Sequence, residues 1–229
     1  MAAKIVINNL YLFKIINFVV YLQLFLKKNL HVMKILEAKF AGSSTKVEQK
    51  PKEILPEFAF IGRSNVGKSS LINTLCASGR LALTSSKPGK TRLVNHFRIN
   101  GEWYLVDLPG YGFAKCSQNE RQKIEEVIRN YLNFSSELKH LFILIDSRHD
   151  LTGADASFLR EMEGSDIPFS IIFTKADKMG PVAGAKQMDK IRKSIAQILE
   201  YEPLCIASSS ETKLGRETIL DYIDKLLTL

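Results

Sequence analysis

Short apolar runs alternate with amphipathic stretches along most of the chain. The runs predict six strands, over 58–61, 92–100, 103–107, 141–145, 171–173 and 204–207. Between them, apolar residues recur at helical spacing, most clearly over 70–75, 122–132 and 186–200. This alternation predicts an α/β fold with a mostly parallel six-stranded sheet and helices on both faces. Gly101 directly joins two of the strands, which predicts a hairpin and hence one antiparallel edge strand.

Residues 1–32 do not follow this pattern. The stretch 10–26 is rich in large apolar residues, but Lys14, Asn17 and Gln23 interrupt it. A signal peptide would need an unbroken apolar stretch and a small-residue cleavage site, and a membrane span would need about 20 largely apolar residues. A helix lying at a membrane interface or against a partner is a third alternative.

A glycine-rich loop follows the first predicted strand. Residues 62–69 match the phosphate-loop pattern G-x-x-x-x-G-K-[ST] and lie between a strand and a helix, where backbone N–H groups can surround a phosphate chain. Lys68 would bring a positive charge to the β- and γ-phosphates, and Ser69 would offer a hydroxyl to Mg²⁺. The sequence therefore predicts a nucleoside triphosphate site made by Gly62, Arg63, Ser64, Asn65, Val66, Gly67, Lys68 and Ser69.

A second motif predicts that the base is guanine. The strand 171–173 runs into Thr174-Lys175-Ala176-Asp177, a variant of the N-K-x-D motif of guanine-nucleotide proteins. Asp177 can accept hydrogen bonds from two adjacent donors that guanine has and adenine lacks, while Lys175 would lay its stem along the base. Small residues after the last strand leave room for the backbone to approach the guanine O6; they are Ser208, Ser209 and Ser210.

Two segments between these motifs are predicted to sense the γ-phosphate. The strand 103–107 ends in Asp107-Leu108-Pro109-Gly110, in which Asp107 would hold the magnesium shell through water and the Gly110 N–H would meet the γ-phosphate. Upstream, Thr91 stands in a Pro/Gly loop directly before a strand, so it is the candidate for the second hydroxyl on Mg²⁺. The other predicted contacts of this loop are Gly89, Lys90, Arg92 and Leu93. Motifs in this order predict a P-loop GTPase fold of the translation-factor class.

The residue after Gly110 is Tyr111, where Ras-like switches carry a Gln that orients the attacking water. An aromatic side chain cannot play that part. The sequence therefore predicts slow intrinsic hydrolysis, unless the water is positioned by another group.

At this point a family resemblance emerges. The segments 59–73, 88–91 and 106–115 closely resemble the EngB (YihA/YsxC) family of bacterial GTPases. Asp146-Ser147-Arg148-His149, together with Thr152 and Asp155, is similar to the family's segment after the fourth strand. The resemblance spans roughly residues 33 to 229.

The resemblance implies a GTPase domain over 57–229 behind a lead-in segment 33–56. Within that segment, the polar residues 41–53 predict a loop or weak strand before the first core strand. It implies a Mg²⁺-dependent enzyme that converts GTP to GDP and phosphate, assists assembly of the large ribosomal subunit through rRNA or ribosomal protein, and is needed for normal division and septation. Catalytic roles fall on Lys68, Thr91 and Gly110, and the metal hydroxyls are those of Ser69 and Thr91. A K⁺ ion near Asn65 is a further implication.

The resemblance also offers a fourth explanation of residues 1–32. Met33 and the residues after it resemble the natural beginning of EngB chains, so a start codon assigned too far upstream would produce the preceding segment.

The charge and the cysteine content limit which partners and which cellular compartment are expected. Half of the net charge of +8 comes from four lysines in residues 1–32, so the remainder is only mildly basic. This charge permits RNA binding without requiring it. The basic residues of the loop 87–92 could contact phosphate or RNA or be solvated, and those of the helix 186–193 are expected to form a solvated face. Three cysteines without a C-x-x-C pair indicate a reducing cytoplasm.

Two functions from different classes remain open at this stage. The first is a cytoplasmic, monomeric GTPase switch that assists ribosome assembly, without DNA or membrane contact. The second is a binding module at the membrane or septum, in which hydrolysis only resets partner docking. An ATP-driven enzyme is disfavoured by Asp177, because adenine would leave its carboxylate unpaired.

Overall fold

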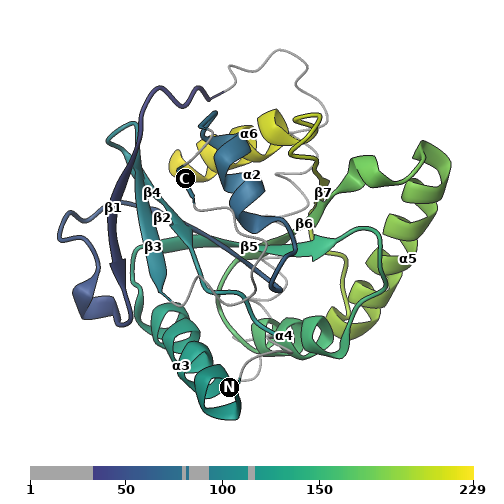
Figure 1. Cartoon of the computed structure of the whole chain (residues 1–229), viewed down its shortest axis with the longest axis horizontal. Helices are drawn as coiled ribbons and strands as arrows, with labels where there is room; N and C mark the ends of the chain where they lie inside the picture. The colour runs from purple at the N-terminus through teal and green to yellow at the C-terminus, as the bar shows by residue number, and fades with distance from the viewer. Residues whose placement is uncertain (1–32, 79–80, 83–92, 113–116) are drawn as a thin grey trace, which may run out of the picture. The chain divides into compact units, whose positions relative to one another are not determined.

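The computed structural model describes residues 33–78, 81–82, 93–112 and 117–229, and Met33–Leu229 form one compact unit. The expectations for residues 1–32 lie outside the described residues. A seven-stranded sheet has the order β1-β3-β4-β2-β5-β6-β7 (Figure 1). The strands are β1 (Ala38–Ser44), β2 (Glu57–Gly62), β3 (Val94–Ile99), β4 (Trp103–Asp107), β5 (Leu138–Asp146), β6 (Phe169–Thr174) and β7 (Cys205–Ala207).

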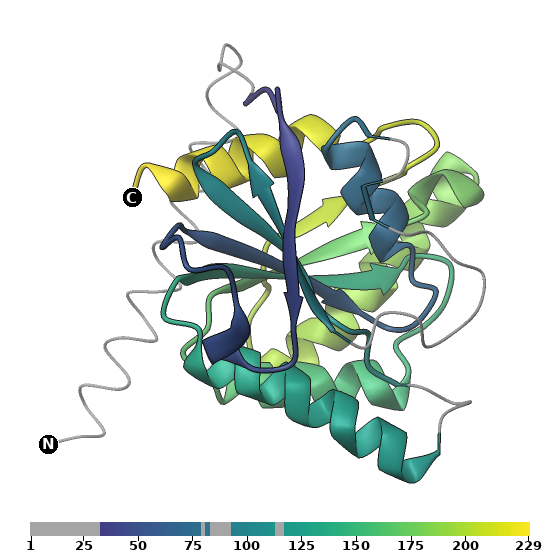
Figure 2. The ribbon, with the colours of Figure 1, turned by 60° about the vertical axis from the view of Figure 1, so that its left-hand side comes forward.

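Helices cover both faces of this sheet. The helices α2 (Lys68–Leu75) and α6 (Arg216–Leu227) lie on one face, and α3 (Gln118–Phe134), α4 (Gly153–Glu163) and α5 (Pro181–Leu199) lie on the other (Figure 2). Two short 3₁₀ turns, η1 (Val47–Gln49) and η2 (Ala176–Lys178), complete the described elements. Within the described residues, no helix combines the length and the apolar character needed to cross a membrane.

The mostly parallel sheet with antiparallel pairing at one edge is confirmed, with one strand more than the six predicted. The strands β2, β4, β5, β6 and β7 pair in parallel, whereas β3 runs antiparallel to both β4 and β1. The additional strand, β1, comes from the lead-in segment. Its residues are mostly exposed, so it has no apolar face that an alternation pattern could reveal.

The parallel strands place the predicted site residues at one edge of the sheet. The central strands β2, β5 and β6 are almost completely buried, which explains why they read as continuous apolar runs. The carboxyl ends of parallel strands are where open α/β sheets bind ligands. Four strands end there on a motif residue; these residues are Gly62, Asp107, Asp146 and Thr174.

The helix starts differ in a way that bears on the site. The helices α3 and α4 each begin with a capping box, formed by Ser117 with Glu120 and by Thr152 with Asp155. In such a box two side chains satisfy the free N–H groups of the first turn. The helix α2 begins after Gly67, and no side chain caps its first turn. The N–H groups at the start of α2 therefore remain available to a ligand.

Candidate functional site

The phosphate loop joins β2 to α2. Gly67 has a φ of 108°, in the left-handed region that glycine favours, and its carbonyl accepts the first hydrogen bond of the helix from Leu71 at 2.9 Å. Asn65 is also left-handed, with a φ of 64°. The loop thus turns sharply into an uncapped helix start, which is a ready anion site.

A buried ion pair crosses the site. The ammonium group of Lys68, the first residue of α2, donates to Oδ1 of Asp107, the last residue of β4. The side chains are 8% and 3% exposed. An isolated charge is costly to bury, and here each of the two residues supplies the opposite charge that the other needs. The lysine of the phosphate loop and the aspartate of D-x-x-G, predicted separately from sequence, are in direct contact.

The D-x-x-G segment lies against the phosphate loop. A Cβ atom on Gly110 would stand 2.9 Å from the Gly62 carbonyl oxygen and 3.1 Å from the Ser64 nitrogen, so only glycine fits without movement of the backbone. The next residue, Tyr111, donates its N–H to the same Gly62 oxygen at 3.2 Å. Leu108 and Pro109 connect the ion pair to this contact.

The Thr-Lys-x-Asp motif is bonded to the phosphate loop from the other side. Thr174 donates its hydroxyl to the carbonyl oxygen of Val66 at 2.6 Å. Lys175 has a φ of 59°, and its ammonium group donates to the carbonyl oxygen of Asn65 at 2.8 Å. Two regions more than a hundred residues apart in the chain are therefore held as one unit.

A carboxylate at the end of β5 supports Lys175, and sequence reasoning gave it no role. Asp146 accepts hydrogen bonds from Lys175 at 2.8 Å and from the guanidinium of Arg148 at 2.8 and 2.9 Å. Burial opposes the ionisation of Asp146, but the bonds from Arg148 and Lys175 outweigh it and hold the pKa of this carboxyl well below its usual range. The spacing Asp-x-Arg at the end of an apolar strand was the available signal.

Asp177 and the small residues after β7 lie together. The N–H of Ser208 donates to Phe173 at 2.7 Å, and the N–H of Ala176 donates to the Ser208 carbonyl at 3.0 Å. A hydrogen bond from Ser209 and the neighbouring Lys178 lower the pKa of Asp177. Ser209 also accepts from two N–H groups of the following turn, and Ser210 is the next residue along it. The segments predicted to read the base thus share one corner of the fold.

Part of the predicted site lies outside the described residues. This part contains Gly89, Lys90, Thr91 and Arg92, so the Mg²⁺ role of Thr91 stays a prediction. Leu93 is described, is 39% exposed and directly precedes β3. Ser69 is half-buried in the first turn of α2, next to Lys68.

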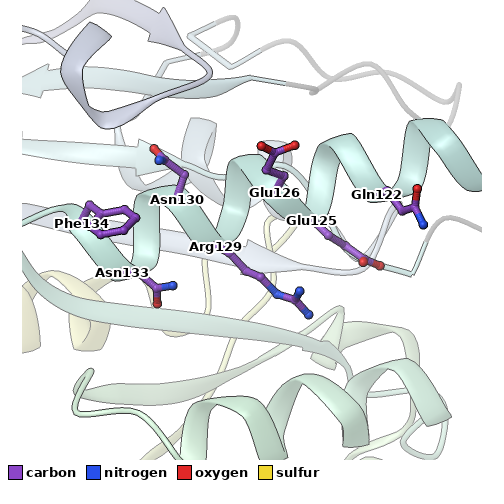
Figure 3. A pocket seen from close by; sticks show the side chains of 7 residues that line it. All are labelled: Gln122, Glu125, Glu126, Arg129, Asn130, Asn133 and Phe134. Carbon is purple, nitrogen blue, oxygen red and sulfur yellow. The ribbon is translucent and has the colours of Figure 1, made fainter.

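A separate pocket of about 410 Å³ lies along α3, and none of the predicted site residues lines it (Figure 3). Its lining is charged and amidic apart from one ring; the residues are Gln122, Glu125, Glu126, Arg129, Asn130, Asn133 and Phe134. Arg129 reaches across to Glu161 of α4 at 3.2 Å, and Asn130 accepts the N–H of Val47 at 2.9 Å. These contacts show that the pocket lies where α3 packs against α4 and against the lead-in segment.

Comparison with known proteins identifies the family. The sequence model described as "50S ribosome-binding GTPase" matches residues 57–175. Among curated relatives, "Probable GTP-binding protein EngB" of Phocaeicola vulgatus is 50% identical over 194 residues, which cover 85% of this chain and 97% of that protein. The protein of the same name from Porphyromonas gingivalis is 46% identical over 194 residues, covering 85% and 96%.

Solved structures support the same fold. The crystal structure of a probable GTP-binding protein engB superposes with a TM-score of 0.60 at 21% identity, covering 75% of this chain and 98% of that one. Era, solved in complex with a GTP analogue and a segment of 16S ribosomal RNA, superposes with a TM-score of 0.58 at 22% identity, covering 76% and 56%. The chain is therefore a GTPase that belongs to the EngB family of GTP-binding proteins.

Proposed function

We propose that this GTPase is a Mg²⁺-dependent cytoplasmic switch that assists assembly of the large ribosomal subunit and is needed for normal septation. The observation that carries the ribosomal part is the match of residues 57–175 to a family described as binding the 50S ribosome. The Era neighbour, which was solved with ribosomal RNA, supports an RNA-containing partner for this fold.

The geometry supports a phosphate role for the buried ion pair. On GTP binding, Lys68 would leave Asp107 and donate to the β- and γ-phosphates, which offer it more negative charge than one carboxylate does. The uncapped first turn of α2 would donate its N–H groups to the β-phosphate. The ion pair thus keeps both charges satisfied until the nucleotide takes over one of them.

The donor set also fits Mg²⁺. The hydroxyl of Ser69 and the carboxylate of Asp107 are hard oxygen donors on adjoining elements, as Mg²⁺ prefers. Thr91 is proposed as the second hydroxyl. Bound there, the ion would neutralise charge on the β- and γ-phosphate oxygens. Release of Asp107 from Lys68 would free its carboxylate for the magnesium shell.

The contacts around Asp177 support guanine recognition. The bonds of Lys175 to Asp146 and Asn65 hold its stem beside the loop that carries Asp177, and the Ser208 backbone closes the same corner. We propose that Asp177 accepts N1–H and the 2-amino group of guanine, while the segment 208–210 faces O6. This division explains a preference for GTP and GDP over adenine nucleotides.

Slow intrinsic hydrolysis remains part of the proposal. Tyr111 is 7% exposed and its hydroxyl is engaged by Asp155, which supports the view that it does not orient the attacking water. We expect a rate well below about one per minute, as in Ras without its activator. Rates in sodium and in potassium, with and without Asn65→Ala, would test whether a monovalent cation near Asn65 contributes.

The ribosomal role is tested by co-sedimentation. Purified protein should sediment with large-subunit precursors in the presence of a non-hydrolysable GTP analogue, and much less with GDP or without nucleotide. Lys68→Ala, which cannot hold the triphosphate, is the control for nucleotide dependence. Binding to lipid vesicles in place of the precursors would favour the membrane-associated alternative and contradict the ribosomal one.

A further inference from the structure

The buried carboxylate of Asp155 joins three segments of the molecule. Asp155 is 1% exposed and is the third residue of α4. Within its own capping box it accepts the N–H and the hydroxyl of Thr152 at 3.0 and 2.7 Å. A capping carboxylate at a helix start is ordinary, but this one has two further partners from outside the helix.

One of these partners lies in a nucleotide motif and the other directly follows one. The guanidinium of Arg63, in the phosphate loop, lies 3.1 Å from Oδ2 of Asp155. The hydroxyl of Tyr111, directly after Gly110, donates to Oδ1 at 3.0 Å. The backbones of Arg63 and Tyr111 also form a parallel β-bridge. One carboxylate thus ties the phosphate loop and the D-x-x-G segment to each other and to α4.

Tyr111 is fixed along its whole length. Its ring stacks on Phe158 of α4 with centroids 4.6 Å apart and planes 15° apart. Burial and the charge of Asp155 raise the pKa of Tyr111 well above its ordinary value, because both disfavour a second negative charge beside the carboxylate. Since Tyr111 is immobilised at both its ring and its backbone, it fixes the place of its neighbour Gly110.

We propose that Asp155 is a positioning residue that sets the preference for GTP over GDP. It does so by holding Tyr111, and through it Gly110, against the phosphate loop where the γ-phosphate is received. The inference rests on the proposed role of Gly110 and names a residue outside the nucleotide-site residues predicted from the sequence.

The effect should be confined to the γ-phosphate. The proposed β-phosphate contacts come from Lys68 and the first-turn N–H groups of α2, and the proposed base contacts come from 174–177 and 208–210. The contacts described for Asp155 reach none of these residues, and in the phosphate loop they reach Arg63 alone. Tyr111→Phe leaves the Arg63 contact of Asp155 in place, so in this variant GDP, which has no γ-phosphate, reports on the remainder of the site.

The primary test is Tyr111→Phe, which removes one hydroxyl and keeps the ring stack on Phe158. Affinities for a non-hydrolysable GTP analogue and for GDP are measured by titration with the full chain. The GTP analogue should bind about five- to tenfold more weakly, with GDP affinity changed less than about twofold, as expected for coupling through one hydrogen bond to a charged group. The kcat for GTP hydrolysis should fall as well, because Gly110 is no longer held in place.

Tyr131→Phe is a closely matched control. Tyr131 is also buried and donates its hydroxyl to a buried carboxylate, Glu57, at 2.7 Å. Glu57 begins β2 and Gly62 ends it, so the two sites are roughly 16 Å apart at about 3.3 Å per residue. The control should lose a similar amount of thermal stability and leave the ratio of GTP to GDP affinity unchanged.

A double-mutant cycle with Asp155→Asn completes the test. The two substitutions should be strongly non-additive in the GTP-to-GDP ratio, because both act on the same hydrogen bond. An unchanged ratio in Tyr111→Phe, an equal loss of GTP and GDP binding, or an increased preference for GTP would each overturn the proposal. Ribosomal binding enters none of these readouts, so a failed co-sedimentation experiment would contradict the proposed function without touching this inference.

Discussion

The two ends of β2 use the same kinds of residue for opposite purposes. At its amino end, the Glu57 carboxylate is 1% exposed and accepts hydrogen bonds from Lys50, Tyr131 and Ser135 at 3.0, 2.7 and 2.6 Å. The partners come from the lead-in segment and from α3 and its end. At its carboxyl end, Lys68 and Asp107 pair with each other beside an uncapped helix start.

The two ends differ in whether a ligand could add favourable contacts to the polar groups that are already paired there. Around Glu57 several donors already surround one carboxylate, so the cluster is a finished structural element that ties the lead-in segment to the core. At the other end, a phosphate chain can offer Lys68 more charge and can satisfy the free N–H groups of α2. Polar burial therefore stabilises the fold at one end and leaves groups available to a ligand at the other.

The largest expected effect tests the functional end. Lys68→Ala should weaken binding of the GTP analogue by about a thousandfold, because the triphosphate loses its main buried cation. Equilibrium titration with a fluorescent analogue measures this loss, and circular dichroism shows whether the variant is folded. Binding within about tenfold of wild type would remove Lys68 from the site.

Glu57→Gln tests the structural end. The neutral amide cannot satisfy the Lys50 ammonium and the two hydroxyls as the carboxylate does, so the free energy of unfolding should fall by about 2–4 kcal/mol. Urea denaturation measures this change. The affinity for GTP of the folded variant should match wild type; a parallel loss of affinity would show that the two ends are coupled and that the comparison fails.

Acid should act through the same carboxylate. Burial opposes ionisation of Glu57, but the His96 ring, 3.6 Å away, and the Ser135 and Tyr131 hydroxyls outweigh it and lower the pKa of Glu57 from 4.5 to about 2. Because the folded pKa lies below the unfolded one, the stabilisation is complete above about pH 4.5 and is lost as the pH falls toward 2.

The loss amounts to on the order of 3 kcal/mol from this one group. Urea denaturation at a series of pH values should therefore give a shallower acid slope for Glu57→Gln than for wild type. The remaining slope belongs to other carboxylates with lowered pKa values, such as Asp146. Identical slopes in the two proteins would mean that Glu57 does not titrate in this range.

Asp177→Asn changes which base is read. The variant should lose about 10- to 100-fold in affinity for GTP and gain for xanthosine triphosphate, because an amide can donate to the carbonyl that xanthine carries in place of the amino group. Competition titrations with both nucleotides measure the exchange. Unchanged GTP affinity would exclude Asp177 from the base site.

The sequence pointed to segments that the structure brings together, but it did not predict the contacts that hold them. The phosphate loop, D-x-x-G and Thr174–Asp177 were found because their chemistry depends on local spacing. Asp146 and Asp155 gained no role from sequence, because their partners include Lys175, Arg63 and Tyr111, which are far away along the chain. The spacing of apolar residues along the chain does not indicate contacts between such distant residues.

The fold shows the same division. Strands buried on both faces, such as β5, were predicted from continuous apolar runs. The strand β1 was anticipated only as a loop or weak strand over 41–53 and was not counted in the sheet, because it is mostly exposed. The helix α5 begins at Pro181, earlier than the predicted 186, because Pro is well suited to a first turn while the apolar spacing starts later. The capping boxes of α3 and α4 were a further signal in the sequence for where these helices begin.

The smallest expected effect concerns Asp146, which supports Lys175 of the proposed base-binding motif. It tests whether this motif is held in place before GTP binds. Asp146→Asn keeps the size of the side chain but removes the charge that holds Lys175 and Arg148. Lys175 would keep its bond to Asn65, so the motif should loosen without being lost.

We expect about a three- to tenfold loss of affinity for GTP and GDP alike, since the base and not the γ-phosphate is affected. This equal loss is the opposite of the pattern expected for Tyr111→Phe. Titrations of both nucleotides on both variants therefore separate the base side from the γ-phosphate side within a single set of measurements. If Asp146→Asn instead changed the ratio of GTP to GDP affinity, the bond between Lys175 and the phosphate loop would have to transmit the change, and the two sides would be one cooperative unit.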